Sequence, residues 1–378
     1  MRFIEETWSS EKLGNLCKIT MGQSPSSKNY SKNSNDTILI QGNADLISGK
    51  IVPRIYTSEI TKLSYPGDII LTVRAPVGDL AINEFDSCIG RGVCSIKGNK
   101  FIYYYLESLK DKHVWERLSQ GSTFESVNSN DIKNLNLKIP SNSTQNHIIN
   151  FFTAIDTKIE LLQKKHGEYI RFKQYLMQNI FADKSAEKLR FKNDKQWNVY
   201  LLRNFINEYN ERMGNKSNLP ILSSTLNGIF LQNEYFNKSV SSKDVKNYKI
   251  VPNGYFTYRS MSDTGKFRFN IQSIVEVGII SPAYPVFSTQ NIDDYFLYYY
   301  LNNSNFIKKQ ILSLKEGGTR YALSFSKFKK LKISLPSLEE QKKIANFLSA
   351  VDKKIDLIQT QIQKMEEFKK GLLQQMFV

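Results

Sequence analysis

The feature that most constrains the fold of this chain is a segment that occurs twice. "NFFTAIDTKIELLQ" runs from Asn150 to Gln163, and "NFLSAVDKKIDLIQ" runs from Asn346 to Gln359. Extended in both directions, the match covers 134–181 against 330–377, which is 48 positions without a gap, 18 of them identical. A repeat of this kind indicates that a structural unit is present twice. We therefore expect the chain to consist of two related halves.

Shorter matches extend the duplication over the rest of the chain. "FIYYYLESL" at Phe101 parallels "FLYYYLNNS" at Phe296, and "QGSTFESV" at Gln120 parallels "EGGTRYAL" at Glu316. "YPGDIILTVR", which ends at Arg74, loosely parallels "VPNGYFTYR". Between these anchors the halves differ almost completely. The predicted order is a variable domain at 1–140, a shared helix at 141–182, a second variable domain at 183–336 and a second shared helix at 337–378.

The shared segments are predicted to be long helices with a heptad seam, because apolar residues recur at alternating steps of four and three. Each helix of about 40 residues would span roughly 60 Å, and a lone exposed seam of that length would be unstable in water. We expect the two seams to pack as an antiparallel coiled coil, which makes the halves a pseudo-two-fold pair. Packing of each helix on its own domain, or on another copy of the protein, is the alternative. The predicted seam, which would also support partner docking, contains Ile148, Phe152, Ile155, Ile159 and Leu162, and Ile344, Leu348, Val351, Ile355 and Ile358.

Polar residues also carry structural signals in these segments. Lys173 and Lys369 occupy seam positions and interrupt the apolar stripe, as does His166. The second helix opens with "PSLEEQ", in which Ser337 can cap the helix and Glu340 can reach back to it. The first helix opens with "PSNSTQNHI" and lacks the acidic residues.

The variable domains are predicted to be mixed α+β. In "DIILTVR", Ile69, Leu71 and Val73 would face inward while Thr72 and Arg74 face outward. "KNLNLKIP" and "KKLKISLP" indicate short strands that end at a proline, and 101–118 and 295–314 indicate helices.

Charge and cysteine content restrict the class of protein. The chain of 378 residues has 52 basic and 36 acidic side chains, and the net charge of +16 favours a polyanion, nucleic acid before an anionic membrane. No run of about 18 apolar residues is present, and Met1–Ser10 resembles neither a signal peptide nor a lipidation site. Three cysteines without paired spacing argue against a disulfide scaffold. We expect a cytoplasmic protein that does not bind membranes.

The sequence contains no recognisable catalytic motif. Neither a phosphate-binding loop nor a glycine-rich cofactor turn occurs, and the Asn/Asp-Pro-Pro-aromatic motif of adenine methyltransferases is missing. His113, His147 and His166 lie far apart, so metal or nucleophilic chemistry through them is not expected. We therefore predict no catalytic residue and no metal site.

Polar, basic loops are the remaining candidate site. Arg, Lys, Gln, Asn and Ser are the residue types that contact base edges and phosphates, and stretches such as "QGNADLISGK" (Gln41–Lys50) are rich in them. For any single position an ordinary solvated loop residue is the more common explanation, but as a set these residues favour DNA. The candidates for DNA binding are Ser24, Lys28, Asn43, Arg54, Arg74, Arg91 and Thr123 in the first half, and Arg259, Lys266, Arg268, Arg320 and Tyr321 in the second.

Taken together, these features resemble the specificity (S) subunit of type I restriction–modification systems. The resemblance is carried by the two "NF(F/L)xA(I/V)DxKI(E/D)L(L/I)Q" helices, the proline-containing helix entries, and the "QGST" and "GGTR" turns, and it covers essentially the whole chain. It implies two target recognition domains, each reading one half of a split, asymmetric sequence in double-stranded DNA. The helices would form a ruler between the half-sites.

The resemblance also implies partners. Two modification (M) subunits would dock on the shared helices, bind S-adenosylmethionine and methylate an adenine that is flipped out of the duplex. Restriction (R) subunits would add ATP- and Mg-dependent translocation and cleavage, while this chain would need no cofactor of its own. Two rival hypotheses remain: a nuclease with an unrecognised site, and a coiled-coil adaptor without a nucleic-acid role.

Overall fold

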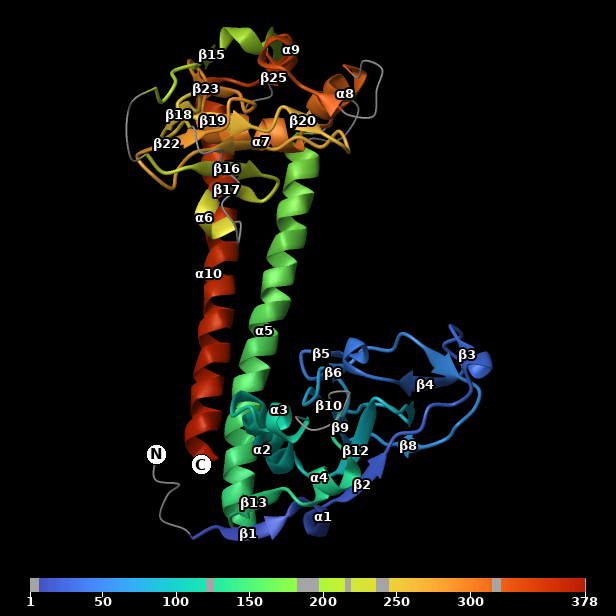
Figure 1. Cartoon of the computed structure of the whole chain (residues 1–378). Helices are drawn as coiled ribbons and strands as arrows, with labels where there is room; N and C mark the ends of the chain where they lie inside the picture. Colours follow the sequence, from blue (N-terminus) through green and yellow to red (C-terminus); the bar gives the residue numbers. More distant parts are fainter. Residues whose placement is uncertain are drawn as a thin grey trace. The chain divides into compact units, whose positions relative to one another are not determined.

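The structure is a computed structural model that describes residues 7–119, 126–181, 197–214, 219–235, 245–314 and 321–377. The chain divides into two compact units (Figure 1). Unit 1 contains residues 1–164 and 359–378, and unit 2 contains residues 165–358. None of the described helices combines the length and apolar character needed to cross a membrane.

Two helices of 39 residues each belong partly to both units. They are α5 (Asn142–Ile180), green in Figure 1, and α10 (Leu338–Met376), red in Figure 1. Unit 1 contains the start of α5 and the end of α10, and unit 2 contains the end of α5 and the start of α10. Within each unit the two helices run antiparallel and share one apolar cluster, which confirms the predicted pairing.

The heptad seams are buried in these clusters, together with residues of the globular parts. Each seam therefore packs both on the other long helix and on the adjacent domain. Helix pairing and packing on the domain are alternatives from the sequence alone, and the structure combines them. Each buried Leu, Ile or Phe side chain contributes about 1.5–3 kcal/mol. Unit 1 brings together Ile148, Phe152, Ile155, Ile159, Leu373 and Phe377, and unit 2 brings together Leu176, Met177, Ile180, Ile344, Leu348 and Val351.

Both long helices begin at a capping serine. The Ser337 hydroxyl accepts a hydrogen bond from the Glu340 amide at 3.3 Å, as predicted, and the Ser141 hydroxyl accepts one from the Thr144 amide at 3.4 Å. The first helix is thus capped without the acidic residues. The Glu340 carboxylate accepts a hydrogen bond from the Trp197 indole at 3.4 Å, which joins the start of α10 to the first residue of the described range 197–214.

The globular part of unit 1 is built mainly of short strands. Its helices are α1 (Leu13–Leu16), α2 (Lys100–Asp111), α3 (Val114–Ser119) and α4 (Ser129–Lys133). Its strands are β1 (Ser9–Lys12), β2 (Lys18–Met21), β3 (Tyr30–Ser31), β4 (Thr37–Ile40), β5 (Leu46–Ile47), β6 (Lys50–Ile51), β7 (Tyr56–Thr57), β8 (Leu63–Ser64), β9 (Ile69–Thr72), β10 (Leu80–Ile82), β11 (Ser87–Ile89), β12 (Val93–Lys97) and β13 (Asn136–Ile139).

These strands form three sheets. A six-stranded sheet has the order β2-β12-β9-β10-β6-β5, a five-stranded sheet has the order β3-β7-β4-β11-β8, and β1 pairs with β13. β4 and β11 run parallel, with Ile40 opposite Ile89, so both strands end at the same edge. The mixed α+β class predicted from the sequence is confirmed.

The strand β9 departs from the prediction. Ile69 and Leu71 lie in the main apolar cluster of unit 1, but Ile70 lies in a second cluster on the other face of the strand. Thr72 is fully buried rather than outward-facing, and its hydroxyl donates to the Pro76 carbonyl and accepts from the Asp79 amide. The alternating pattern fails because both faces of this central strand are covered.

The globular part of unit 2 has different sheets. Its helices are α6 (Gln232–Tyr235), α7 (Asp294–Asn303), α8 (Asn305–Ser313) and α9 (Phe325–Phe328). Its strands are β14 (Asn198–Leu201), β15 (Ile206–Glu208), β16 (Leu222–Thr225), β17 (Gly228–Leu231), β18 (Lys249–Pro252), β19 (Phe256–Tyr258), β20 (Met261–Ser262), β21 (Phe269–Ile271), β22 (Val277–Ile280), β23 (Val286–Thr289), β24 (Tyr321–Ala322) and β25 (Lys332–Leu335). A four-stranded sheet has the order β15-β23-β19-β21, and the pairs are β14-β25, β16-β17, β18-β22 and β20-β24.

The two helices predicted at 101–118 and 295–314 are each divided into two. The break between α2 and α3 contains His113, whose backbone φ is +53°. The break between α7 and α8 is Ser304, which has an extended backbone with a ψ of 124°. Neither conformation continues an α-helix.

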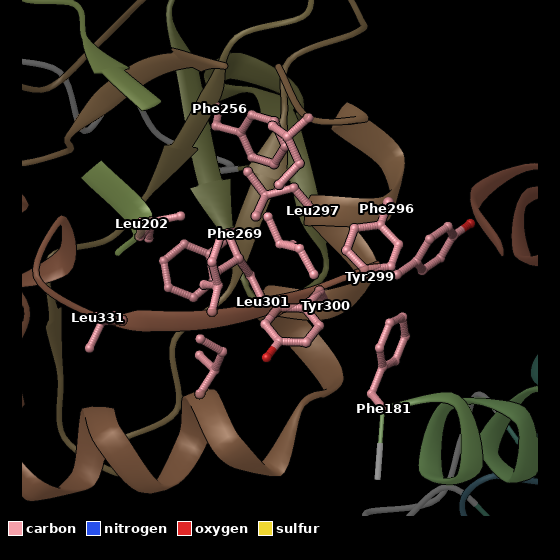
Figure 2. Packing of buried hydrophobic residues seen from close by; sticks show 14 of the residues in the cluster. Phe181, Leu202, Phe256, Phe269, Phe296, Leu297, Tyr299, Tyr300, Leu301 and Leu331 are labelled. Atoms are coloured by element: carbon pink, nitrogen blue, oxygen red, sulfur yellow. The ribbon is translucent and has the colours of Figure 1, made fainter. Parts of the chain in front are cut away.

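The duplication extends to individual hydrogen bonds. The Tyr105 hydroxyl accepts from the Lys138 amide in unit 1, and the Tyr300 hydroxyl accepts from the Ser334 amide in unit 2. The ring of Phe181, at the end of α5, packs against Tyr300 at 5.7 Å in the core of unit 2 (Figure 2). In unit 1, Phe377 packs in the same way against Tyr105 at 5.0 Å. The shared elements are thus built alike in both units.

Candidate nucleic-acid interface

Three loops meet at one edge of unit 1, and we call them the strand-end corner. They are 22–24 after β2, 41–43 after β4 and 90–92 after β11. A Cβ atom on Gly92 would lie 2.0 Å from the Gln41 carbonyl oxygen, and one on Gly22 would lie 2.1 Å from the Gly90 carbonyl oxygen. Only glycine permits such close approach of two backbones. The loops are held together by their main chains, which leaves their side chains available for contacts.

The side chains of the corner are polar and partly exposed. The Ser24 hydroxyl accepts a hydrogen bond from the Arg91 amide at 3.1 Å, while the Arg91 guanidinium and Asn43 are exposed. Buried Asp45 accepts hydrogen bonds from the Gln41 amide at 2.8 Å and from Arg54 Nε at 2.9 Å. Arg54 therefore neutralises a buried carboxylate and keeps about half of its side chain in solvent. Four of the predicted DNA-binding residues, Ser24, Asn43, Arg54 and Arg91, lie on or beside this corner.

Lys28 and Arg74 are exposed elsewhere on unit 1. Lys28 lies in the turn Ser27–Asn29, beside Glu59, whose pKa is lowered by hydrogen bonds from Ser26 and Asn29. Arg74 follows β9 and forms an isolated bridge with Ser126. The Val127 amide donates to the Val73 carbonyl, and in unit 2 the Leu323 amide donates to the Ser260 carbonyl. This bond matches Val73 with Ser260, whereas within the strands Thr72 and Thr257, which are both fully buried opposite a valine of the next strand, match as in the sequence parallel.

In unit 2, three of the predicted residues lie near the pair β20-β24. Arg259 is exposed just before β20, and its charge opposes the burial that raises the pKa of Tyr284. Tyr321 belongs to β24, and its ring lies close to Gly265, the residue before exposed Lys266. Arg268 has a different role, because its guanidinium donates to the Tyr298 hydroxyl and stacks 5.1 Å from the centre of that ring. Thr123 and Arg320 lie outside the described residues.

The lysines that interrupt the seams form ion pairs within each unit. In unit 1, Lys369 Nζ of α10 lies 2.8 Å from Asp156 of α5 and 2.8 Å from Glu107 of α2. Burial lowers the pKa of Lys369, but the two carboxylates raise it by more, so the net shift is upward. The Tyr104 hydroxyl donates to Asp156 at 2.8 Å. We call this group the unit 1 lysine cluster.

Unit 2 contains the equivalent group, with the helices exchanged. Lys173 of α5 lies 2.5 Å from Asp352 of α10, and the Tyr299 hydroxyl donates to Asp352 at 2.8 Å. Asn302 stands where unit 1 has Glu107, and its carboxamide is hydrogen-bonded to the backbone of Phe269. This unit 2 lysine cluster therefore contains one carboxylate instead of two, and its lysine is more exposed, at 34% against 12% for Lys369.

The outward faces of the long helices carry exposed apolar side chains, some of which are repeated. Phe172 and Phe368 occupy equivalent positions and are 44% and 53% exposed, and Leu161 and Leu357 are 58% and 49% exposed. By contrast, exposed Tyr175 corresponds to Gly371. The seam residues predicted to support docking are mostly buried within the units, whereas these side chains of the outward faces are exposed.

A matching cleft lies beside each lysine cluster. The cleft of unit 1 has a volume of about 770 Å³ and is lined by Asp156, Lys369 and Lys110, among others. The cleft of unit 2 has a volume of about 1050 Å³ and is lined by the equivalents Asp352 and Lys173. Among the described residues, no group of three or more His, Cys, Asp and Glu side chains could hold a metal ion.

Comparison with known proteins agrees with this geometry. The model of the type I restriction modification DNA specificity domain matches the chain twice, over residues 5–168 and 195–367. The chain belongs to this family. The predicted resemblance is confirmed, and the two matches coincide with the duplication. Relatives of the chain are named as specificity subunits of type I restriction enzymes.

Individual relatives support the same assignment. The chain is 36% identical over 195 residues to the putative type I restriction enzyme MjaX specificity subunit of Methanocaldococcus jannaschii, a match that covers 49% of this chain and 45% of that protein. The chain thus spans about half the length of this relative. The S subunit of the type I system from M. genitalium has the same fold, with a TM-score of 0.62 and 17% identity over 100% of this chain and 98% of that one.

A second solved structure, from work on assembly and conformational transition of the type I restriction–modification system, gives a TM-score of 0.57 and 16% identity over 98% of this chain and 97% of that one. Sequence reasoning missed the lysine clusters. The polar residues at seam positions 173 and 369 were the available signal for the clusters, because a buried lysine requires a carboxylate partner. Gln41 opens the candidate stretch Gln41–Lys50, although only Asn43 of that stretch was chosen as a candidate residue.

Proposed function

We propose that this chain reads a split, asymmetric sequence in double-stranded DNA, with the globular part of each unit contacting one half-site. The supporting observation is the contrast between the units: the shared helices, caps and clusters repeat, whereas the sheets and exposed loops of the globular parts differ. A protein that must read two different half-sites with one scaffold needs this combination. The net charge of +16 supports binding to a polyanion.

The division into 1–140 and 183–336 as recognition domains, and 141–182 and 337–378 as shared helices, is part of this proposal. The helices would set the separation between the half-sites, since both units contain parts of both helices. The proposed place of action is the cytoplasm, which is consistent with the buried and unpaired state of Cys17, Cys88 and Cys94.

We further propose that two methyltransferase subunits dock on the repeated outward faces and clefts, and that restriction subunits join that complex. Duplicated surfaces suit two copies of one partner. S-adenosylmethionine, ATP and Mg would be bound by those partners, and this chain would contribute sequence selection.

The test is a selection from random duplexes by the chain in complex with a type I methyltransferase subunit from the same organism. At raised salt, where contacts with phosphates weaken, we expect the selected duplexes to share two constant blocks with a spacer of fixed length. Selection of no sequence would favour the coiled-coil adaptor. Cleavage by the purified chain alone with a divalent metal, abolished by one carboxylate substitution, would favour the nuclease.

A further inference from the structure

We propose that the strand-end corner of unit 1 reads a base-pair edge in one half-site, with Gln41 as a specificity residue beside Arg91 and Asn43. This inference rests on the proposed function and goes further by assigning the reading surface. The corner combines a rigid backbone frame with side chains that suit base edges. Arginine pairs with guanine, and asparagine or glutamine pairs with adenine, in the major groove.

The frame is fixed by main-chain hydrogen bonds that join the loops 22–24 and 90–92 to the ends of the strands β4, β11 and β12. The Gly22 amide donates to the Val93 carbonyl at 3.0 Å, and the Gln23 amide donates to the Ile89 carbonyl at 2.9 Å. The Gly90 amide donates to the Ile40 carbonyl at 2.8 Å. Binding sites on rigid elements hold their side chains with less ordering cost than sites on loose loops. The corner therefore does not need to fold around its ligand.

The second observation concerns the Gln41 side chain. Its Nε2 atom is buried and has no hydrogen-bond partner among the described residues. Leaving a buried donor unpaired is unfavourable, and most such donors in proteins find an acceptor. The Gln41 Cγ atom lies 3.3 Å from the place of a Cβ atom on Gly90, so its stem runs beneath the loop that carries Arg91. The Gln41 side chain as a whole is half-buried, so rotation about its own torsions, with the main-chain frame unchanged, would bring the amide to an acceptor supplied by DNA.

Charge in the corner also favours DNA. The carboxylate of Asp45, buried below the loops, already accepts from two backbone amides and from Arg54. Arg91 extends from the same corner into solvent. The groups that remain available at the corner are thus the Arg91 cation, which matches the two acceptors of guanine, and the carboxamides of Asn43 and Gln41, which match the acceptor and donor of adenine.

The test repeats the random-duplex selection with the assembled complex carrying Arg91→Ala, Asn43→Ala or Gln41→Leu. Leucine has a similar size to glutamine but removes the amide. Arg117→Ala is the matched control, because Arg117 is an exposed arginine of unit 1 on α3, away from the corner. We expect Arg91→Ala and Gln41→Leu to lower discrimination at one or two positions of one half-site by about tenfold to a hundredfold. The other half-site and the Arg117→Ala selection should match the wild type.

Three results would overturn the assignment. An unchanged motif for Gln41→Leu and Arg91→Ala, with unaltered thermal melting, would mean that the corner is not a reading surface. Equal loss of affinity for all duplexes would mean phosphate contact only. A change in both half-sites would mean an indirect effect on the scaffold. If the wild-type complex itself selects no split motif, the proposed function fails instead, which distinguishes the two failures.

Discussion

Lys369 Nζ of α10 lies 2.8 Å from Asp156 Oδ1 of α5, and at the equivalent place in unit 2 Lys173 Nζ of α5 lies 2.5 Å from Asp352 Oδ1 of α10. Each pair crosses from one long helix to the other, and a tyrosine of the adjacent domain donates to the same carboxylate. A buried polar pair restricts the register of paired helices, because a shift along the seam would leave both charges unpaired.

The two lysine clusters should differ in their contribution to stability. Lys369→Met would leave Glu107 and Asp156 without their shared cation in a largely buried site, so we expect the free energy of unfolding to fall by about 3 kcal/mol. Lys173→Met removes a more exposed pair with one carboxylate, and a loss of about 1 kcal/mol or less is expected. Chemical denaturation of each full-chain variant measures both values. Equal losses would contradict the difference in burial.

The raised pKa of Lys369 predicts a dependence of stability on alkaline pH. Because the folded-state pKa lies above the unfolded value of about 10.4, the stabilising contribution is complete below that pH and is lost as the pH rises through the folded value. The difference in unfolding free energy between wild type and Lys369→Met should therefore be constant from pH 7 to 9. It should decrease above about pH 10.5. A difference that shrinks on acidification toward pH 7 would contradict this sign.

The duplicated architecture could be predicted from the sequence because it depends on side-chain periodicity and repetition. The seam positions from Ile148 to Leu162 and from Ile344 to Ile358 follow a heptad, and burial of that stripe leaves few arrangements in water. The ion pairs of Lys173 and Lys369, which interrupt this apolar stripe, could not be predicted from periodicity. Their carboxylate partners lie on the other helix and, in unit 1, also on α2.

The candidate interface was less predictable. Residue type alone selected Arg54 and Arg268, yet the structure engages Arg54 with buried Asp45 and Arg268 with Tyr298. Tertiary contacts between distant segments decide which arginines remain available. The same limit applied to Thr72, whose outward orientation was inferred from alternation while its strand is covered on both faces.

Arg74 and Arg259 should each affect one half-site. Both are exposed at the ends of strands that belong to different units. We expect Arg74→Ala to alter the selectivity for one block of the target and Arg259→Ala to alter the other, each by about 1–3 kcal/mol at the position read. Competition binding with single-base variants of the selected duplex measures both effects. A uniform, sequence-independent loss would indicate that these arginines contact phosphates.

The repeated phenylalanines should contribute to partner docking. Phe172→Ala and Phe368→Ala each remove an exposed ring from one of two equivalent surfaces, so each single variant should weaken binding of one methyltransferase copy. Native mass spectrometry should show loss of one copy for each single variant and of both for the double variant. Tyr175→Ala is the control, since its ring is exposed on α5 but not repeated on α10. Retention of two copies by the double variant would exclude this surface.

The most direct test of the account is long-read mapping of N6-methyladenine in cells that express a type I methyltransferase subunit from the same organism with and without this chain. We predict a split, asymmetric motif that appears only when this chain is present. Methylation that is independent of the chain, or confined to one continuous motif, would contradict the claim that its two units read two half-sites.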